Sequence, residues 1–211
     1  MAGETVSLRF DGGRRVTLNA PGRHQVYAAL AAVAVGRCLG MSDDEIAAGL
    51  ESYRPPGMRC QVERLGEVTV INDAYNASPP SMWAAMDLLG SWQTKGRRVL
   101  VCGDMKELGP AEVHWHRRLG QEIAQRRWID HCVAVGPLSV TVVEEARRSG
   151  MSADSISHCD SADQAAAALR QMLCDGDVVL VKGSRAMQLE ETVQGLREWL
   201  AGGAGCSSAI V

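Results

Sequence analysis

The chain has few aromatic side chains, no excess of positive charge and no long apolar run. Only 4% of its 211 residues are aromatic, while 46% are hydrophobic, so small aliphatic side chains must build the core. The formal net charge is -3, and no basic surface indicates nucleic acid as a partner. A membrane helix needs about 20 apolar residues. Since no stretch of the sequence approaches that length, we expect no membrane partner.

Paired cysteine motifs are also absent. The seven cysteines are scattered, their number is odd, and none forms a C-x-x-C pair. Several lie inside apolar runs, so we expect reduced and mostly buried thiols, as in a reducing compartment. The N-terminus lacks the basic segment followed by an apolar segment that marks a signal peptide. We therefore expect a cytoplasmic protein.

Motifs for covalent catalysis, phosphate binding and metal binding are missing as well. The sequence contains no G-x-S-x-G nucleophile motif and no G-x-x-x-x-G-K-[ST] phosphate loop. His114 and His116 are two residues apart on an expected helix, so they point in different directions and do not make an i, i+4 metal pair. We expect neither a catalytic residue nor a metal site made by this chain alone.

The start of the chain indicates a β-hairpin followed by a helix. Apolar and polar residues alternate over residues 6–10 and 15–18, around the turn residues Asp11-Gly12-Gly13. After Pro21-Gly22, a helix is expected over residues 23–39. This helix should place three apolar side chains on one face: Val26, Leu30 and Val33.

Capping residues then locate two more helices. Ser42 and Glu45 form a capping box that opens a helix through about residue 50. Residues 62–71 indicate two short strands about a glycine. Ser78 followed by Pro79 is typical of an N-cap with proline at the first helical position, and this helix should end near residue 89.

A regular alternation of strands and helices follows the polar residues 91–96. Strands are expected at 98–102, 131–135, 155–158 and 178–181, and helices at 112–127, 138–148, 161–173 and 186–200. The alternation predicts an α/β, doubly wound, Rossmann-like domain with a parallel sheet. Residues 178–181 are apolar on both faces, so they should form a central strand.

The start of this regular alternation of strands and helices suggests a division of the chain into three segments. Residues 1–94 look like the back end of a larger domain, because they show no obvious start of a sheet of their own. Residues 95–201 look like a complete domain. Residues 202–211 are small and polar, and we expect them to be a disordered tail.

Polar side chains gather where the strand at 68–71 ends and the next helix begins. Asn72, Asp73, Tyr75 and Asn76 follow the strand, at a place where α/β sheets commonly bind ligands. A carboxylate there can accept two hydrogen bonds from a ribose diol, and a phenol can stack on a base. Alternatively, the amides and the carboxylate only close a turn and cap the helix.

Two further loops follow expected strands. After the strand at 98–102, Asp104 and Glu107 could contact an ammonium group, or could simply be solvated. After the strand at 178–181, Lys182, Ser184 and Arg185 surround a glycine at the start of a helix. Free backbone N–H groups, the helix dipole and two cations favour a carboxylate or phosphate there. Alternatively, Lys182 and Arg185 are simply solvated and Ser184 is the N-cap of the helix.

Five blocks of the sequence resemble, in register, motifs of the Mur ligase family. They lie at residues 21–32, 57–59, 72–82, 101–109 and 181–185. The family patterns are P-G-x-H-N-x-x-N-A-L-A-A, P-G-R, N-D-x-Y-N-A-x-P-x-S-M, V-x-G-D-M-x-E-L-G and V-K-G-S-R. His116 falls where the histidine trailing the fourth block stands. The resemblance implies that residues 1–94 are the later part of the family's central, ATPase-type domain and that residues 95–201 are its Rossmann-like C-terminal domain. The match is closest to members that ligate D-alanyl-D-alanine.

The resemblance implies a role for each matching position. The adenosine side of an ATP site is implied for His24, Arg59, Asn72, Asp73, Tyr75 and Asn76. The incoming dipeptide would face Asp104, Glu107, His116, Lys182, Ser184 and Arg185. Members of the family use ATP and Mg²⁺ to make an acyl phosphate of UDP-N-acetylmuramoyl-tripeptide, which the amine of D-alanyl-D-alanine then attacks.

Two departures from the family pattern limit this inference. The family has two asparagines near the adenine, where this chain has Gln25 and Ala28, and Ala28 cannot hydrogen-bond through its side chain. The family's phosphate loop, Mg²⁺ ligands and UDP-binding domain lie upstream of the matched region. The resemblance therefore implies a partner, the missing N-terminal half of the ligase, and an isolated chain that is inactive.

Three hypotheses follow. The first is a portion of a ligase that adds D-alanyl-D-alanine in peptidoglycan synthesis. The second is a non-catalytic α/β binding module derived from such a ligase, which the changed asparagine positions favour. The third is a nucleotide-binding α/β domain with an unrelated ligand.

Overall fold

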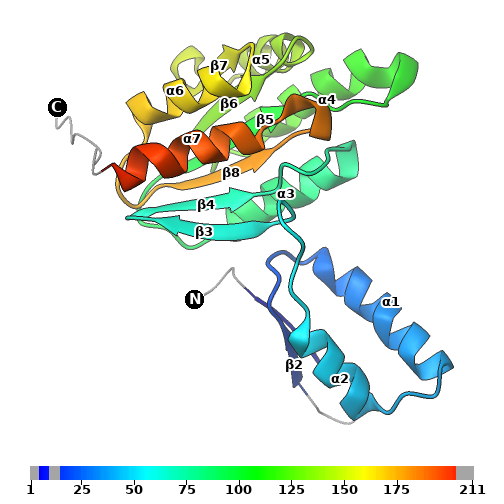
Figure 1. Cartoon of the computed structure of the whole chain (residues 1–211). Helices are drawn as coiled ribbons and strands as arrows, with labels where there is room; N and C mark the ends of the chain where they lie inside the picture. The colour runs from blue at the N-terminus through cyan, green and yellow to red at the C-terminus, as the bar shows by residue number, and fades with distance from the viewer. Residues whose placement is uncertain (1–4, 10–14, 203–211) are drawn as a thin grey trace.

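The computed structural model describes residues 5–9 and 15–202, which form a small N-terminal unit and a larger α/β domain (Figure 1). The expected hairpin turn at Asp11-Gly12-Gly13 and the expected tail beyond residue 202 lie outside the described residues. Within them, no helix is both long enough and apolar enough to cross a bilayer.

The N-terminal unit is a β-hairpin packed on two helices. It consists of β1 (Val6–Arg9), β2 (Arg15–Leu18), α1 (Gln25–Cys38) and α2 (Asp43–Ser52). The strands pair antiparallel, as predicted. The predicted capping box is confirmed: Ser42 Oγ accepts from the Glu45 N–H at 3.3 Å, and the Glu45 carboxylate accepts from the Ser42 N–H at 2.8 Å. Its small core contains Val16, Leu18, Ala29, Val33, Ile46, Ala47 and Leu50.

The expected inner face of α1 was only partly right. Val33 is buried, but Leu30 is 54% exposed. The buried stripe is Ala29, Val33 and Gly36 instead, because small side chains let α2 come close. A Cβ on Gly36 would lie 2.8 Å from Ile46 Cγ1. The larger apolar side chains of α1 are consequently turned away from α2.

The larger domain is built on one six-stranded sheet. Its strands are β3 (Gln61–Leu65), β4 (Val68–Asn72), β5 (Arg98–Gly103), β6 (His131–Val135), β7 (Ile156–Cys159) and β8 (Val178–Lys182). Their order is β3-β4-β8-β5-β6-β7. Only β3 runs antiparallel to its neighbour; the other pairs are parallel. All residues of β8 are buried, which confirms the predicted central strand.

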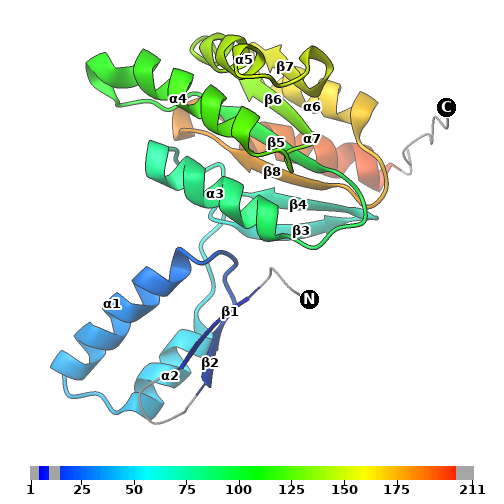
Figure 2. The ribbon, with the colours of Figure 1, turned by 180° about the vertical axis from the view of Figure 1, so that it is seen from behind.

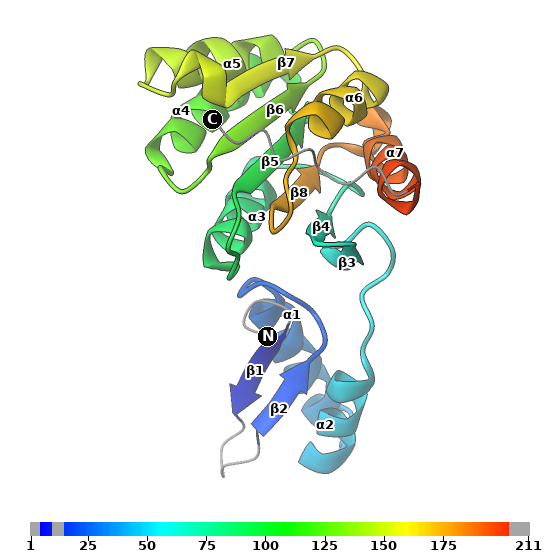
Figure 3. The ribbon, with the colours of Figure 1, turned by 90° about the vertical axis from the view of Figure 1, so that its left-hand side faces the viewer.

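Helices cover both faces of the sheet, as expected for the doubly wound class. One layer consists of α3 (Pro79–Ser91), α4 (Glu112–Gln125) and α5 (Ser139–Arg148), seen in front in Figure 2. The other consists of α6 (Ala162–Met172) and α7 (Glu190–Ala201), and the end-on view separates the two layers (Figure 3). Short 3₁₀ helices lie at η1 (Gly109–Ala111), η2 (Ala153–Ser155) and η3 (Arg185–Met187).

Alternate residues of each strand feed two separate cores. Ile71 and Leu180 point into the core under α3, α4 and α5, together with Leu100. Their neighbours Val70 and Val179 point into the core under α6 and α7. This two-sided burial explains why the strands read as continuous apolar runs.

The sheet does not stop at the expected boundary between residues 94 and 95. β4 pairs with β8, so that Ile71 lies opposite Leu180, and α3 packs into the same core as α4 and α5. The change of core falls instead between Leu50 and Cys60, across an extended linker. The sequence did not show this because the β4–β8 pairing joins residues far apart in the chain.

A truncation series tests this division of the chain. We expect residues 53–202 to unfold cooperatively, and residues 95–202 to lack a cooperative transition. The shorter fragment loses β3, β4 and α3, and with them the buried Met82, Ala85, Met86, Leu88 and Leu89. The hydrophobic free energy lost with that apolar burial is comparable to the whole net stability of a typical domain, about 5–15 kcal/mol. Thermal unfolding followed by circular dichroism measures both, and a sharp transition in the 95–202 fragment would contradict the finding.

Candidate functional site

Three neighbouring parallel strands, β4, β8 and β5, end at one edge of the sheet. Each is followed there by a polar side chain or loop: Asp73 after β4, Lys182 at the end of β8, and Asp104 after β5. The carboxyl edge of such a sheet is where open α/β folds bind ligands. The structure thus brings three of the five sequence blocks to a single place.

An ion pair joins two of these strand ends. Lys182 Nζ lies 2.6 Å from Asp73 Oδ2 and 2.9 Å from the carbonyl oxygen of Asn76. The other carboxylate oxygen of Asp73 accepts from the Cys60 N–H at 3.1 Å. The side chains of Lys182 and Asp73 are only 4% and 14% exposed. The ammonium of Lys182 is thus buried against the chain's own Asp73, and its implied contact with an incoming dipeptide stays a prediction.

The amides of the same turn act locally. Asn72 is buried, and its Oδ1 accepts from the Ala74 N–H at 3.2 Å. Asn76 Oδ1 accepts from the Ala77 N–H at 2.8 Å. Pro79 is the first residue of α3, as predicted. For Asn72 and Asn76, the geometry matches the turn-closing alternative, so they shape the place where Asp73 lies.

His24 brings the N-terminal unit to this edge. Its Nε2 lies 3.8 Å from Cys60 Sγ and 3.3 Å from Gln25 Nε2. Burial lowers the pKa of His24, while the charge of Asp73 opposes this shift and that of Lys182 adds to it. The imidazole is therefore neutral at pH 7. His24 thus lies near Asp73, and the adenosine-side role implied for both residues stays a prediction.

The turn before β3 has a strained backbone. Met58 and Cys60 have φ angles of +61° and +51°, in the left-handed region that non-glycine residues rarely adopt. The Met58 carbonyl accepts from the Tyr75 N–H at 3.1 Å, which holds this turn against the one after β4. Burial is also the main reason that the pKa of the Cys60 thiol is raised to about 12.

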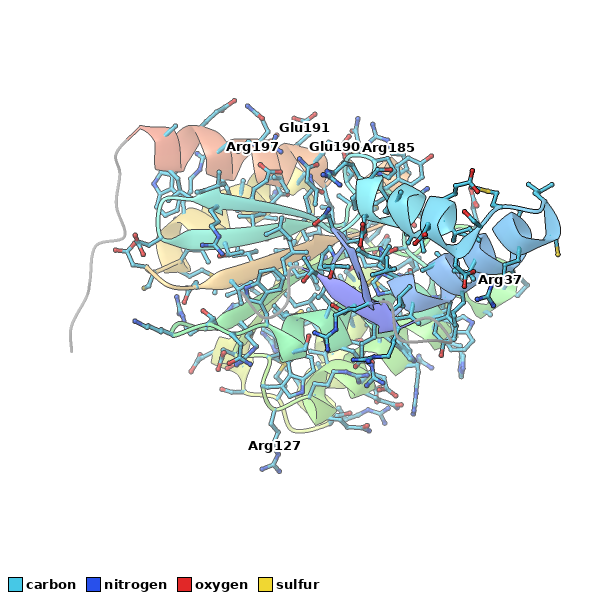
Figure 4. The ribbon with its side chains drawn as sticks, turned by 90° about the horizontal axis from the view of Figure 1, so that it is seen from below. Arg37, Arg127, Arg185, Glu190, Glu191 and Arg197 are labelled. Carbon is cyan, nitrogen blue, oxygen red and sulfur yellow. The ribbon has the colours of Figure 1, made fainter. Side chains whose placement is uncertain are left out.

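Arg59 and Tyr75 form an exposed stacked pair. The Arg59 guanidinium carbon lies 4.0 Å from the centre of the Tyr75 ring. One face of the phenol is thus covered by a cation rather than open to a base. Arg185 is exposed too and pairs with Glu190, beside it in Figure 4. The hydrogen bond to Glu190 is the main cause that raises the pKa of Arg185, so this side chain stays charged.

Asp104 is fully buried and has three partners within the chain. It accepts from Lys106 Nζ at 2.9 Å, from Ser139 Oγ at 2.9 Å and from the Leu138 N–H at 3.2 Å. Gly136, with φ +108°, makes room for it, because a Cβ there would lie 2.9 Å from the Asp104 carboxyl carbon. The ammonium group that Asp104 contacts in this structure is that of Lys106, and its implied contact with a dipeptide stays a prediction.

His116 and Ser184 hold the same loop from two sides. His116 is buried, and its Nε2 accepts a hydrogen bond from the Met105 N–H at 3.0 Å. Its Nδ1 lies 2.7 Å from the carbonyl oxygen of Glu112. These two contacts fix the tautomer that carries the proton on Nδ1. Ser184 Oγ accepts from the Lys106 N–H at 2.8 Å. Like Asp104, these two side chains hold the loop in place, and their implied contact with a dipeptide stays a prediction.

Lys106 is a site candidate that the sequence reasoning missed. Its side chain is 36% exposed, and its ammonium is anchored on the buried Asp104. Glu107 next to it is exposed and has a φ angle of +64°. The sequence contained a pattern that could have identified Lys106: a lysine two residues after an acidic residue, in the loop directly after a buried strand. The exposed charged groups of this edge are therefore Lys106, Glu107, Arg59 and Arg185.

A groove of about 760 Å³ separates the N-terminal unit from α3. Its walls include His24 and Tyr27 on one side and Pro80, Trp83 and Asp87 on the other. Gln25 and Ala28, which replace the family's asparagines, line instead an apolar cavity of about 390 Å³ between α1 and α2. Within residues 5–9 and 15–202, no group of three His, Cys, Asp or Glu side chains is placed to hold a metal ion.

Comparison with known proteins gives a consistent result. The domain family described as "Mur ligase, glutamate ligase domain" matches residues 58–185. The UDP-N-acetylmuramoyl-tripeptide–D-alanyl-D-alanine ligase of Bacillus subtilis is 37% identical over 178 residues, covering 84% of this chain and 38% of the relative. The enzyme of the same name from Escherichia coli is 34% identical, with 89% and 40% covered.

Solved structures agree with the sequence matches. A crystal structure of MurF from Acinetobacter baumannii superposes with a TM-score of 0.80 at 30% identity, covering 92% of this chain and 42% of that one. A MurF ligase from Thermotoga maritima, solved in complex with ADP, has a TM-score of 0.75 at 24% identity and shares the fold. The chain thus spans about two fifths of the length of the curated relatives it matches.

Thiol labelling tests the contact between His24 and Cys60. With iodoacetamide at pH 8, we expect rapid alkylation of the exposed Cys38 and Cys174 and almost none of Cys60. Cys60 is buried and its thiol has a pKa of about 12, so little thiolate exists at pH 8. Peptide mass spectrometry after a time course measures each site. Labelling of Cys60 at the rate of Cys38 would show that the contact with the N-terminal unit opens readily.

Proposed function

Since the chain belongs to the Mur ligase family, we propose that it is a portion of an ATP-dependent, amide-forming ligase of peptidoglycan synthesis. In this proposal, the ligase adds D-alanyl-D-alanine to UDP-N-acetylmuramoyl-tripeptide, as the names of the relatives state for them. The observation that carries the proposal is the convergence of Asp73, Lys182 and the Asp104 loop, from separate sequence blocks, on one sheet edge.

The nucleotide side of the proposed site uses the turn after β4. Asp73 is part-exposed, and each of its oxygens makes one hydrogen bond and can accept another, which suits a ribose diol. Arg59, stacked on Tyr75, suits a phosphate. His24, Asn72 and Asn76 shape the surroundings. The ADP complex of the Thermotoga maritima ligase supports an adenine nucleotide as the ligand.

The phosphates and Mg²⁺ require groups that the described residues do not gather. Phosphoryl transfer depends on a metal ion and several donors held around the phosphates. No described cluster of acidic side chains fits a metal ion, and the sequence has no phosphate loop. We therefore assign the Mg²⁺ ligands to the remainder of the ligase and expect no turnover by this chain alone. Measurable ATP-dependent amide formation by the purified chain would refute this.

The dipeptide side of the proposed site uses the exposed charges of the neighbouring loops. Lys106 and Arg185 suit the carboxylate of D-alanyl-D-alanine, and Glu107 suits its ammonium. Asp104, His116 and Ser184 serve this side indirectly, by fixing the loop that presents Lys106. Lys182 is left out of the carboxylate site because its ammonium is buried.

The exposed apolar surface of α1 supports the proposal that the chain is a portion of a larger assembly. The helix is apolar almost all round, yet several large side chains of the helix and its C-cap residue are exposed: Tyr27 77%, Leu30 54%, Val35 58% and, at the C-cap, Leu39 76%. An all-round apolar helix belongs inside a domain, and a contiguous exposed apolar face marks an interaction surface. We assign this face to the remainder of the ligase, including its phosphate loop.

A non-catalytic binding module derived from a Mur ligase is the second candidate. Gln25 and Ala28 favour it, because they take the places of the family's adenine-side asparagines and line an apolar cavity. In that case the exposed face of α1 would dock on another protein, and nucleotide would not bind.

Variants of Lys106 test the dipeptide site. We expect Lys106→Met to weaken binding of D-alanyl-D-alanine about tenfold, because a charge-assisted hydrogen bond is lost. Lys95→Met removes an exposed lysine before β5, at the opposite end of that strand, and should leave binding unchanged. NMR titration of the whole chain measures both. Wild-type affinity in Lys106→Met would remove Lys106 from the site, and no binding by wild type would remove the dipeptide from the proposal.

Variants of α1 test the assembly. We expect the double variant Leu30→Asp, Val35→Asp to keep the chain's own thermal midpoint within a few degrees, because both side chains are exposed. It should no longer associate with the separately produced N-terminal portion of the Bacillus subtilis relative. Arg127→Asp, on a remote exposed site labelled in Figure 4, is the matched control. Analytical ultracentrifugation measures association, and equal association of both variants would contradict the assignment.

A further inference from the structure

Lys182 is the buried cation of the site, and the contacts of its ammonium are all directed at the turn after β4. Its Nζ donates to Asp73 Oδ2 at 2.6 Å and to the Asn76 carbonyl at 2.9 Å. These two acceptors lie three residues apart, at the beginning and the end of the turn. One ammonium thus fixes both ends of the segment that leads from β4 into α3.

Asp73 depends on this contact for its orientation. The Cys60 N–H holds one carboxylate oxygen at 3.1 Å, and Lys182 holds the other. With both oxygens anchored, the carboxylate has a single defined rotamer and still has acceptor capacity on each oxygen. It remains part-exposed, whereas Lys182 is nearly inaccessible, so a ligand reaches Asp73 and not the ammonium.

We infer that Lys182 is a positioning residue for the nucleotide, which orients Asp73 toward the ribose hydroxyls and so sets the preference for a ribonucleotide. The inference rests on the proposed function, since it deepens the role of Asp73 in the adenosine side of the site. It moves Lys182 from the dipeptide carboxylate, where the sequence motif placed it, to the nucleotide side. The preference for ribose hydroxyls is the property that a merely structural lysine would not control.

The experiment compares binding of ADP and 2′,3′-dideoxyadenosine 5′-diphosphate to the whole chain by calorimetry. We expect the wild type to prefer ADP about tenfold, the contribution of a hydrogen bond to a charged group. Lys182→Met should bind ADP about as weakly as the dideoxy analogue, with affinity for the analogue unchanged. Affinity for D-alanyl-D-alanine should stay within about twofold of wild type.

Two further variants keep the test valid if Lys182→Met is unstable. Removing one partner of a buried pair leaves an unpaired charge, whereas Asp73→Asn with Lys182→Met removes both charges. If Lys182 acts through Asp73, the double variant and Asp73→Asn alone should bind ADP equally. Arg197→Met is the matched control, because it breaks another ion pair of 2.6 Å, to Glu63 on β3, outside the site. It should retain the wild-type preference.

The outcomes separate this inference from the proposed function. A Lys182→Met variant that keeps the tenfold preference for ADP overturns the inference and leaves the nucleotide site standing. Loss of D-alanyl-D-alanine binding with the preference intact returns Lys182 to the dipeptide carboxylate. A wild type that binds both nucleotides equally removes Asp73 from the ribose, and with it the role of Lys182. No binding of either nucleotide at millimolar concentration overturns the nucleotide side of the proposed function as well.

Discussion

The parallel pairing of β4 with β8 is the constraint on which the rest of the structure depends. It inserts the last strand of the chain between β4 and β5, so that strand ends from distant segments meet at one edge. Asn72 lies opposite Val181, which puts Asp73 and Lys182 side by side, one residue further on. The ion pair is therefore a consequence of strand register, and a shift of one residue would turn the two side chains to opposite faces.

Each of two loops at this edge contains an aspartate paired with a lysine. Asp73 holds Lys182, and Asp104 holds Lys106, in each case with further backbone or hydroxyl donors on the same carboxylate. A buried carboxylate without partners would be costly, so these networks stabilise the fold only while they are complete. The two networks differ in burial: the side chain of Lys182 lies in the interior, whereas that of Lys106 reaches the surface. The same chemistry thus produces a buried lysine in one loop and, in the other, a lysine that the proposed function assigns to ligand binding.

The features that could be predicted from the sequence are those that local residue patterns determine. The capping box at Ser42, the proline at the start of α3 and the fully buried β8 depend on neighbouring residues or on one strand's composition, and the structure confirmed them. The domain boundary and the partner of Lys182 depend on β4 meeting β8 across most of the chain. No local pattern contains that pairing, so the sequence motifs gave no indication that Lys182 pairs with Asp73.

Under the proposed function, Arg59 alone is not sufficient to hold the phosphates of a nucleotide. Stacking on Tyr75 uses the flat face of the guanidinium and leaves its N–H groups at the edge, where they suit a phosphate oxygen. A single exposed guanidinium in water contributes little against the charge of three phosphates, because solvent screens it. Enclosing the phosphates would lower the local dielectric and strengthen the same contact. The apolar face of α1 lies on the N-terminal unit that carries His24 to the site, so covering that face and enclosing the phosphates are consistent with one docking event.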